Sequence, residues 1–465
     1  MKYDFLIVGS GSSGGVLAHT LQEAGAHCLL LEAGRHYTAD TFPRNDADSS
    51  AQLFWGGGIE FDDRCTMGFL RGKCVGGGSI INQCLLDRFD DVALADWKSD
   101  SGISYFTPEG MDPYYAAAEE ALSLQVIPER HRNRNARLFL EGLEKQGIQS
   151  APLRRGQSNC ALDEGNDCIG CLGGCHRDSK QSTLVAYVGK AQAAGLKVVP
   201  DCHVSHIASV SGGVKVHAHT SGKPETYEGR RCILAAGSFG TTQILLRSGL
   251  KEKLPALGTG FSAHPQFMTF AEFDEPVDAH KGAFQSVKSS DSGLRKRGYK
   301  LENVYAPPAS VAMLYQGYGA PIQQFMARYR HYACLEVAVR DEAAGEMRVD
   351  SKGRLSIRKP LTDQDKRRRD DGLALVREIY ESLNARRVYV SPLCFCLHLM
   401  GGCPIGIDPR TSVVNEAFQV HDLPDVFVAD TSTYPNAPGI NPALTCMALA
   451  HRLTKILKSE AALAA

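Results

Sequence analysis

The chain has no excess of either charge and no long hydrophobic run. Its 51 basic and 52 acidic residues leave a formal net charge of −1 over 465 residues. It therefore offers neither the basic surface expected of a nucleic-acid-binding protein nor a polybasic membrane anchor. No stretch reaches the roughly 18 unbroken apolar residues that a transmembrane helix requires. The chain opens on a strand-like segment, "MKYDFLIVGSG", with no room for a signal peptide. We therefore expect a cytoplasmic protein, unless it is exported with a partner subunit that carries the signal.

A glycine-rich turn follows the first apolar run of strand length, "DFLIVG". Gly9, Gly11 and Gly14 fit the pattern G-x-G-x-x-G, and Ser12 lies within it. A stretch of helical periodicity comes next, and the following apolar run, "HCLLLEAG", contains Glu32. Such a turn lets backbone N–H groups approach a pyrophosphate, while the acid accepts hydrogen bonds from a ribose hydroxyl. The pattern predicts a site for an ADP moiety with a free ribose.

Further strand-like runs that end in a glycine or an acid occur in mid-chain, "RRCILAAG", and near the carboxyl end, "PDVFVAD". Their distribution predicts an α/β fold (α+β overall) with a Rossmann-like, doubly wound domain built from discontinuous segments. The rest should form a substrate domain with a mainly antiparallel sheet packed by helices, in which "RVDSKGRLSIR" predicts a hairpin. The expected division is 1–90, 180–262 and 398–465 for the nucleotide domain, and 91–179 and 263–397 for the substrate domain, with a cysteine-rich loop at 160–175.

Three motifs resemble signatures of the glucose–methanol–choline (GMC) flavin oxidoreductases. "RGKCVGGGSIINQC" at 71–84 resembles the first signature, and "AAGSFGTTQILLRSG" is similar to the second. A carboxyl-terminal block with "HLMGGCPIG" and "GINPALT" resembles the third. The resemblance covers both ends and the middle of the chain. It implies an FAD-dependent oxidoreductase that acts on CH–OH donors, so that FAD rather than NAD is the expected cofactor.

The resemblance also implies which residues hold FAD. Three consecutive glycines followed by Ser79 can lay backbone N–H groups along a pyrophosphate or a flavin edge. Choline-oxidase-like members link FAD to a histidine at the position of Ile81, so FAD is expected to be non-covalent here. Val204 would meet the adenine, and Asp430 would bind the ribityl chain. The expected FAD-binding residues are Gly9, Gly11, Ser12, Gly14, Glu32, Gly76, Gly77, Ser79, Asn82, Val204, Asp430 and Pro442.

Two residues near the carboxyl end are the candidate catalytic groups. Alcohol oxidation needs a base for the hydroxyl proton and a donor that holds the oxygen, while a hydride leaves the same carbon for flavin N5. His398 in "LHLMGGC" and Asn441 in "GINP" match the family positions for these roles, so the resemblance implies His398 as base and Asn441 as donor. Without the motif, His398 would be read as a core histidine and Asn441 as a turn residue. His264 in "FSAHPQ" also matches a family position, where we expect a structural hydrogen bond.

Most of the 15 cysteines stand singly in apolar runs and are expected to be small core residues. Cys160, Cys168, Cys171 and Cys175 are clustered instead, with the spacing C-x7-C-x2-C-x3-C. Iron–sulfur clusters accept such uneven spacing, and the segment resembles one in GMC dehydrogenases whose cysteines bind a cluster. Alternatives are a turn with buried thiols, or a zinc site, although only one C-x-x-C pair is present.

These observations predict an FAD-dependent alcohol or sugar dehydrogenase. Electrons would leave through an iron–sulfur cluster to an external acceptor, such as a protein, a partner subunit or a quinone. One alternative is an oxidase that reduces O2 to H2O2 without a metal cluster. A second alternative is a GMC-like lyase or photodecarboxylase without net redox turnover.

Overall fold

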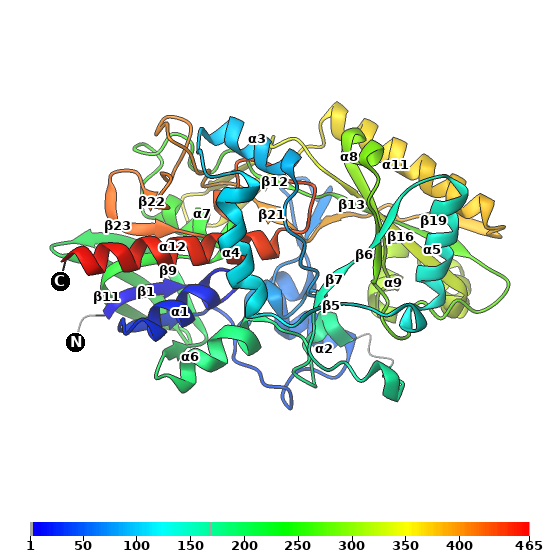
Figure 1. The fold of residues 1–465 in the computed structure, drawn as a ribbon, viewed down its shortest axis with the longest axis horizontal. Helices are drawn as coiled ribbons and strands as arrows, with labels where there is room; N and C mark the ends of the chain where they lie inside the picture. The colour runs from blue at the N-terminus through cyan, green and yellow to red at the C-terminus, as the bar shows by residue number, and fades with distance from the viewer. Residues whose placement is uncertain (1–2, 167–169, 465) are drawn as a thin grey trace.

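The computed structural model describes residues 3–166 and 170–464, and it shows two halves that lie side by side (Figure 1). One half is built on a largely parallel sheet with helices around it, and the other on a mainly antiparallel sheet. Each half has its own cluster of buried hydrophobic side chains. This is the α/β architecture with a second, antiparallel sheet that the sequence predicts.

The parallel sheet has the strand order β22-β23-β11-β1-β2-β8, and β10 and β9 continue from β11 as an antiparallel extension. Neighbours β23, β11, β1, β2 and β8 all run parallel. Parallel strands are covered on both faces, which explains why residues 5–8 of β1 and all of β2 are apolar. The bounds are β1 (Tyr3–Val8), β2 (Cys28–Leu31), β8 (Lys197–Val199), β9 (Cys202–Val210), β10 (Gly213–Thr220), β11 (Lys223–Leu234), β22 (Gln419–Val420) and β23 (Leu423–Val428).

Helix α1 (Gly14–Glu23) follows β1 after the glycine-rich turn and packs against α12 (Ala443–Ala464), which also contacts α4 (Pro108–Glu120). Helix α3 (Asp91–Ser101) contributes Leu94 and Trp97 to the same core. The helices of 91–120 therefore pack on the nucleotide half, whereas the expected division placed them in the substrate domain. The remaining helices around this half are α6 (Gly189–Ala193) and α7 (Gly237–Arg247).

The second sheet has the order β3-β4-β20-β13-β16-β15-β14-β6, and β19 also pairs with β13. Helices α5 and α11 pack on one face of it, at the outer side of this half (Figure 1). Strands β3 and β4 belong to this sheet, although the expected division placed them in the nucleotide domain. The bounds are β3 (Glu60–Phe61), β4 (Met67–Phe69), β6 (Ser150–Pro152), β13 (Gln266–Glu272), β14 (Val287–Ser289), β15 (Tyr299–Asn303), β16 (Tyr332–Val339), β19 (Arg387–Val390), β20 (Cys394–Cys396), α5 (Arg134–Lys145) and α11 (Asp363–Ser382).

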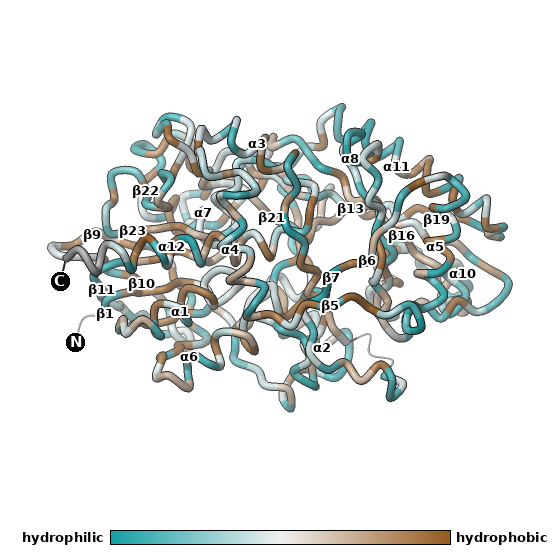
Figure 2. The backbone as a smooth tube through the Cα atoms, in the orientation of Figure 1, coloured by the Kyte–Doolittle hydropathy of each residue, from teal (hydrophilic) through white to brown (hydrophobic). Residues whose placement is uncertain are grey.

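Short elements complete the fold. The hairpin expected from "RVDSKGRLSIR" is confirmed as an antiparallel pair of strands, β17 and β18. Figure 2 shows hydrophobic residues along the middle of both halves and hydrophilic residues on many outer loops. Among the described helices, none combines the length and the apolar character needed to cross a membrane. The bounds are α2 (Asp46–Leu53), β5 (Leu124–Val126), β7 (Arg154–Gly156), β12 (Ser262–Ala263), α8 (Ser292–Arg297), α9 (Pro308–Tyr315), α10 (Ala320–Ala327), β17 (Glu346–Val349), β18 (Leu355–Arg358) and β21 (Leu399–Met400).

Candidate active site

A cavity of about 1430 Å³ runs from the glycine-rich turn after β1 to the inner face of the antiparallel sheet. At one end it is lined by residues 9–13, and at the other by side chains of β13, β15 and β16. Both catalytic candidates, His398 and Asn441, line it as well. The cavity thus joins the predicted nucleotide site to the predicted site of chemistry.

The glycines of the turn have distinct roles. Gly9 has a φ of +95°, and a Cβ on it would lie 2.4 Å from the carbonyl oxygen of Ala235. A Cβ on Gly14 would lie 1.8 Å from the carbonyl oxygen of Gly9, so both positions require glycine for backbone packing. Gly11 differs, because a Cβ there would meet nothing within 4 Å and the residue lines the cavity. The space beside Gly11 is therefore room for a ligand.

Glu32 and Asp430 are buried carboxyl groups that line this end of the cavity. Glu32 accepts hydrogen bonds from the backbone and hydroxyl of Ser10, at 3.0 and 2.6 Å, and from the backbone of Gly34 at 2.9 Å. Asp430 accepts from the backbone N–H of Gly237 at 2.8 Å. Burial raises the pKa of both carboxyl groups, and these donors oppose that shift. Glu32 thus shapes the turn while facing the expected ribose.

The residues predicted to bind FAD fall into two groups. Gly76 and Ser79 shape the second glycine loop rather than line the cavity: the N–H of Gly76 donates to Ser10 Oγ at 2.9 Å, and Ser79 Oγ donates to the carbonyl oxygen of Gly76 at 2.6 Å. Gly14 belongs with them. The buried Ser13 hydroxyl lines the cavity and has no hydrogen-bond partner in the described part of the chain. The cavity, the open side of Gly11 and this unused hydroxyl fit a bound dinucleotide. The predicted residues that line the cavity are Gly9, Gly11, Ser12, Glu32, Gly77, Asn82, Val204, Asp430 and Pro442.

His398 lies in the short link between β20 and β21, where the chain leaves the antiparallel sheet. Its Nδ1 lies 3.0 Å from Nδ1 of His264, and His264 Nε2 accepts a hydrogen bond from the backbone N–H of Gly439 at 2.9 Å. Gly439 is two residues before Asn441, so this chain of contacts brings the two candidates to one place. The hydrogen bond expected for His264 is thereby confirmed.

The same contacts fix the proton positions of the two rings. A backbone N–H can only donate, so His264 Nε2 is an acceptor and the neutral ring carries its proton on Nδ1. That proton faces Nδ1 of His398, so a neutral His398 carries its own proton on Nε2, the nitrogen left for a ligand. Burial and the charge of Lys300 lower the pKa of His398 to about 3. His398 is therefore neutral and offers the cavity an N–H donor.

Asn441 lies just before α12, and its amide is oriented by Lys300 of β15. The Lys300 ammonium donates to Asn441 Oδ1 and, at 2.5 Å, to Glu302 Oε1. Because an ammonium group has no acceptor, the amide atom that it contacts must be oxygen. The Nδ2 of Asn441 is then the end of the amide available to a ligand. His398 and Asn441 thus both present N–H donors.

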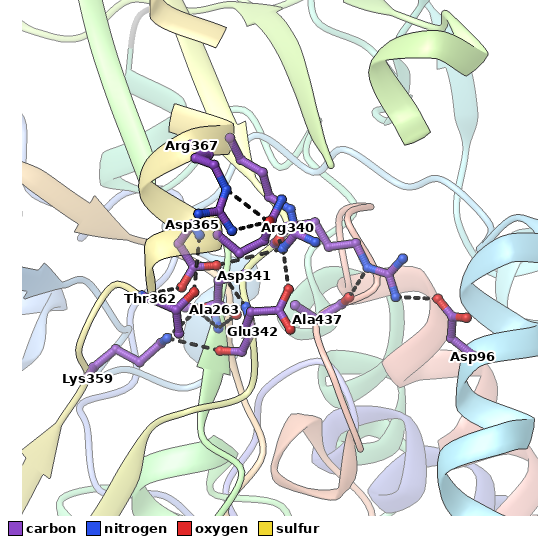
Figure 3. A network of polar contacts seen from close by, with 12 residues as sticks. Asp96, Ala263, Arg340, Asp341, Glu342, Lys359, Thr362, Asp365, Arg367 and Ala437 are labelled. Atoms are coloured by element: carbon purple, nitrogen blue, oxygen red, sulfur yellow. Dashed lines mark hydrogen bonds and ion pairs between the residues drawn. The ribbon is translucent and has the colours of Figure 1, made fainter. Parts of the chain in front are cut away.

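A polar network that contains the buried pair of Asp341 and Lys359 anchors the segments that carry His264 and Asn441 (Figure 3). Asp341 accepts from the backbone N–H of Ala263 at 3.1 Å and forms an ion pair with Lys359 at 2.6 Å, with both side chains fully buried. Arg340 donates to the carbonyl oxygen of Ala437 at 2.7 Å and to Asp96 of α3 at 2.6 Å. The network therefore ties both segments to the antiparallel sheet and to α3.

Sequence reasoning did not identify the polar groups on the inner face of the antiparallel sheet. The cavity is lined by Glu302, Glu336, Gln266 and Gln285. Lys300, on the same strand as Glu302, contacts Glu302 and Asn441 at its edge. One signal was present: Glu336 is the single acid in the apolar strand "YACLEVAV". A charged residue at the centre of such a strand requires a partner or a function.

The cysteine-rich loop borders the cavity through Gly170 and Gly173, but it does not display the predicted metal site. Cys168 lies outside the described residues. Of the others, Cys171 is buried, and Cys160 and Cys175 are partly exposed. Within the described part of the chain, no three His, Cys, Asp or Glu side chains are placed so that they could hold one metal ion. The predicted ligand set of Cys160, Cys168, Cys171 and Cys175 thus finds no support in the described geometry.

The comparison with family models gives two matches, both described as GMC oxidoreductase. The amino-terminal model matches residues 3–266, and the carboxyl-terminal model matches residues 341–450. The two matches contain the glycine-rich turn, all three later motifs, His398 and Asn441.

Individual relatives agree with the family match. The chain is 27% identical to the long-chain-alcohol oxidase FAO4B of Arabidopsis thaliana, over 99% of this chain and 68% of that protein. It is 24% identical to a cholesterol oxidase of Acinetobacter baumannii, over 98% of this chain and 95% of that protein. Among solved structures, pyridoxine 4-oxidase from "Mesorbium loti" shares the fold with a TM-score of 0.78 at 17% identity, over 98% of this chain and 99% of that one.

Proposed function

The chain belongs to the GMC oxidoreductase family, and on that premise we propose that it oxidises a small-molecule alcohol with non-covalently bound FAD. When bound, FAD supplies the acceptor for the hydride that leaves the carbinol carbon. One observation carries the proposal: His398 and Asn441 line the same cavity as the glycine-rich turn and are linked through His264 and Gly439. Choline-oxidase-like members link FAD to a histidine at the position of Ile81, and an isoleucine cannot form that bond. This supports non-covalent binding.

In this proposal His398 and Asn441 hold the substrate oxygen together. The hydroxyl proton leaves to solvent as the hydride leaves the carbinol carbon, and the Nε2–H of His398 and the Nδ2–H of Asn441 donate to the oxygen while it carries alkoxide-like negative charge. Donors that are already oriented stabilise such charge without further reorganisation. Their orientation is set by His264 for the imidazole and by Lys300 for the amide.

The prediction that His398 also removes the hydroxyl proton stays a prediction. A base needs a lone pair on His398 Nε2, so the proton of this ring would have to sit on Nδ1. His264 would then carry its proton on Nε2, where its N–H would face the backbone N–H of Gly439. The base role also requires a higher proton affinity than the pKa of about 3 allows. The resting hydrogen bonds support the donor role of His398 instead.

For the electron acceptor, we propose O2. The relatives named long-chain-alcohol oxidase and cholesterol oxidase match nearly the whole chain and support this choice. The dehydrogenase with an iron–sulfur cluster that the sequence predicts rests on cysteines whose described members form no ligand set. An external acceptor protein or partner subunit is not needed for the oxidase.

The experiment that tests the proposal is an anaerobic titration of the flavin-loaded protein with a panel of alcohols. Oxidation predicts that an alcohol substrate bleaches the flavin absorbance and yields the aldehyde or ketone. A lyase or photodecarboxylase would leave the flavin oxidised at the end of turnover. An oxidised flavin after prolonged exposure to every alcohol of the panel would contradict the proposal.

A further inference from the structure

The antiparallel sheet presents an unusual row of side chains to the cavity. In the register of the sheet, Glu302 of β15 lies opposite Glu336 of β16, which in turn lies opposite Met268 of β13. Like charges directly opposite each other destabilise an antiparallel pair. The two acids are 1% and 3% exposed respectively, so water does not screen them. Stability does not explain this arrangement.

The hydrogen bonds of the two acids differ. Glu302 uses both carboxyl oxygens, one for Lys300 at 2.5 Å and the other for the Gln285 amide at 2.7 Å. Glu336 has no hydrogen bond to any described residue, although it is buried and lines the cavity. A buried carboxyl group without a partner is costly unless a ligand supplies one.

A second unpartnered group lies on the same face. Gln266 is 2% exposed, lines the cavity, and its Oε1 has no hydrogen-bond partner among the described residues. Ala338 of β16 pairs with Gln266 of β13 on one side and with Lys300 of β15 on the other. This row lies next to the row of Glu336 on the same face of the sheet. The inner face of the sheet therefore offers unused hydrogen-bonding groups beside the amide of Asn441.

We propose that Glu336 determines substrate specificity by binding a second hydroxyl group of the alcohol, with Gln266 beside it, so that polyhydroxylated alcohols are preferred to simple monoalcohols. This inference rests on the proposed alcohol oxidation. It goes further because it assigns part of the cavity to a group that does not react. No covalent step is involved, since Glu336 only donates and accepts hydrogen bonds.

Charge favours a hydroxyl over an ammonium group at Glu336. The Lys300 ammonium contacts Glu302 and Asn441, both of which line the cavity, so a positive charge already lies beside this part of it. Burial and the facing Glu302 carboxylate raise the pKa of Glu336, which favours a neutral carboxyl that can both donate and accept. A second cation would be repelled by Lys300 and would require Glu336 to ionise beside Glu302.

The test compares alcohols that differ only in their further hydroxyl groups: glycerol with n-propanol, and sorbitol with n-hexanol. The measured quantity is the ratio of kcat/KM for polyol and monoalcohol in the wild type, Glu336→Leu and Glu336→Gln. We expect the wild type to prefer the polyols, and Glu336→Leu to lose about tenfold or more of that ratio, the effect of one buried hydrogen bond. Glu336→Gln keeps a neutral donor and acceptor and should retain most of it.

The outcomes separate this inference from the proposed function. Equal ratios in the wild type and Glu336→Leu, with both proteins folded and containing flavin, would overturn the role of Glu336 while alcohol oxidation stands. Preference for aminohexanol over sorbitol in the wild type would overturn the hydroxyl assignment. Flavin that no alcohol bleaches would overturn the proposed function, and this inference with it.

Discussion

Lys300 donates a hydrogen bond to Asn441 Oδ1 from a strand of the other half of the molecule. The contact decides which end of the amide a ligand meets, because an ammonium group cannot accept a hydrogen bond. Glu302 holds Lys300 in place. Asn441 therefore acts as a donor whose direction depends on a residue 141 positions away in the chain.

Substitution of Lys300 by Met should lower kcat much more than it raises KM, because the donor would lose its orientation in the transition state. Hydrogen bonds to charged groups contribute about 1.5–3 kcal/mol, so a loss of roughly tenfold to a hundredfold is expected. Lys300→Arg keeps a cationic donor and should retain more activity. Steady-state kinetics with matched flavin content provide the measurement. Unchanged kcat in Lys300→Met would show that Asn441 needs no such support.

The glycine turn allows a matched pair of variants. In Gly11→Ala the added methyl group projects into the cavity, so the protein should fold with wild-type thermal stability but bind FAD more weakly. In Gly14→Ala it would collide with the carbonyl oxygen of Gly9 and should lower the melting temperature as well. Flavin content and thermal melts of the apoproteins separate the two effects. Equal flavin affinity in Gly11→Ala and wild type would place the cofactor elsewhere.

Local sequence patterns account for where the residues at one end of the cavity lie. Each of three features follows a strand: the turn at residues 9–14, Glu32 and Asp430. The hydrophobic runs of these strands and the glycine or acid that ends each run are visible in the sequence, so these positions at the strand ends could be expected. The other end depends on sheet register. Glu302 and Glu336 become neighbours only because β15 and β16 pair in one register, and a slip by one residue would turn each side chain to the opposite face. No pattern in a single sequence specifies that pairing.

The buried ion pair of Asp341 and Lys359 should be important for stability. Both side chains are fully buried, and Lys359 Nζ lies 2.6 Å from Asp341 Oδ2. Asp341 also accepts a hydrogen bond from the backbone N–H of Ala263. Lys359→Met would leave the Asp341 carboxylate without its cation and should destabilise the fold by about 3–5 kcal/mol. Lys359→Met combined with Asp341→Leu should recover part of this loss, as denaturant unfolding would show. A single variant as stable as the wild type would mean that the pair contributes little.

The proposed acceptor can be tested by adding air to alcohol-reduced protein. An oxidase should regain its flavin absorbance rapidly and form one H2O2 for each alcohol oxidised. Replacement of Cys160 and Cys175 by Ser should not change this rate, because the proposal gives neither cysteine a role. Slow reoxidation together with stoichiometric iron and sulfide in anaerobically purified protein would instead favour the dehydrogenase and its cluster.

The role of His398 is tested most directly by the rate at which an alcohol bleaches the bound flavin without oxygen in wild type, His398→Ala and His398→Gln. If His398 holds the substrate oxygen through Nε2–H, the alanine variant should keep its flavin but lose about 10²–10³ in rate, the usual effect of removing one such donor. The glutamine variant, which still offers an N–H, should recover much of that loss. Bleaching of the alanine variant at nearly the wild-type rate would contradict the assignment of His398 to the reacting oxygen.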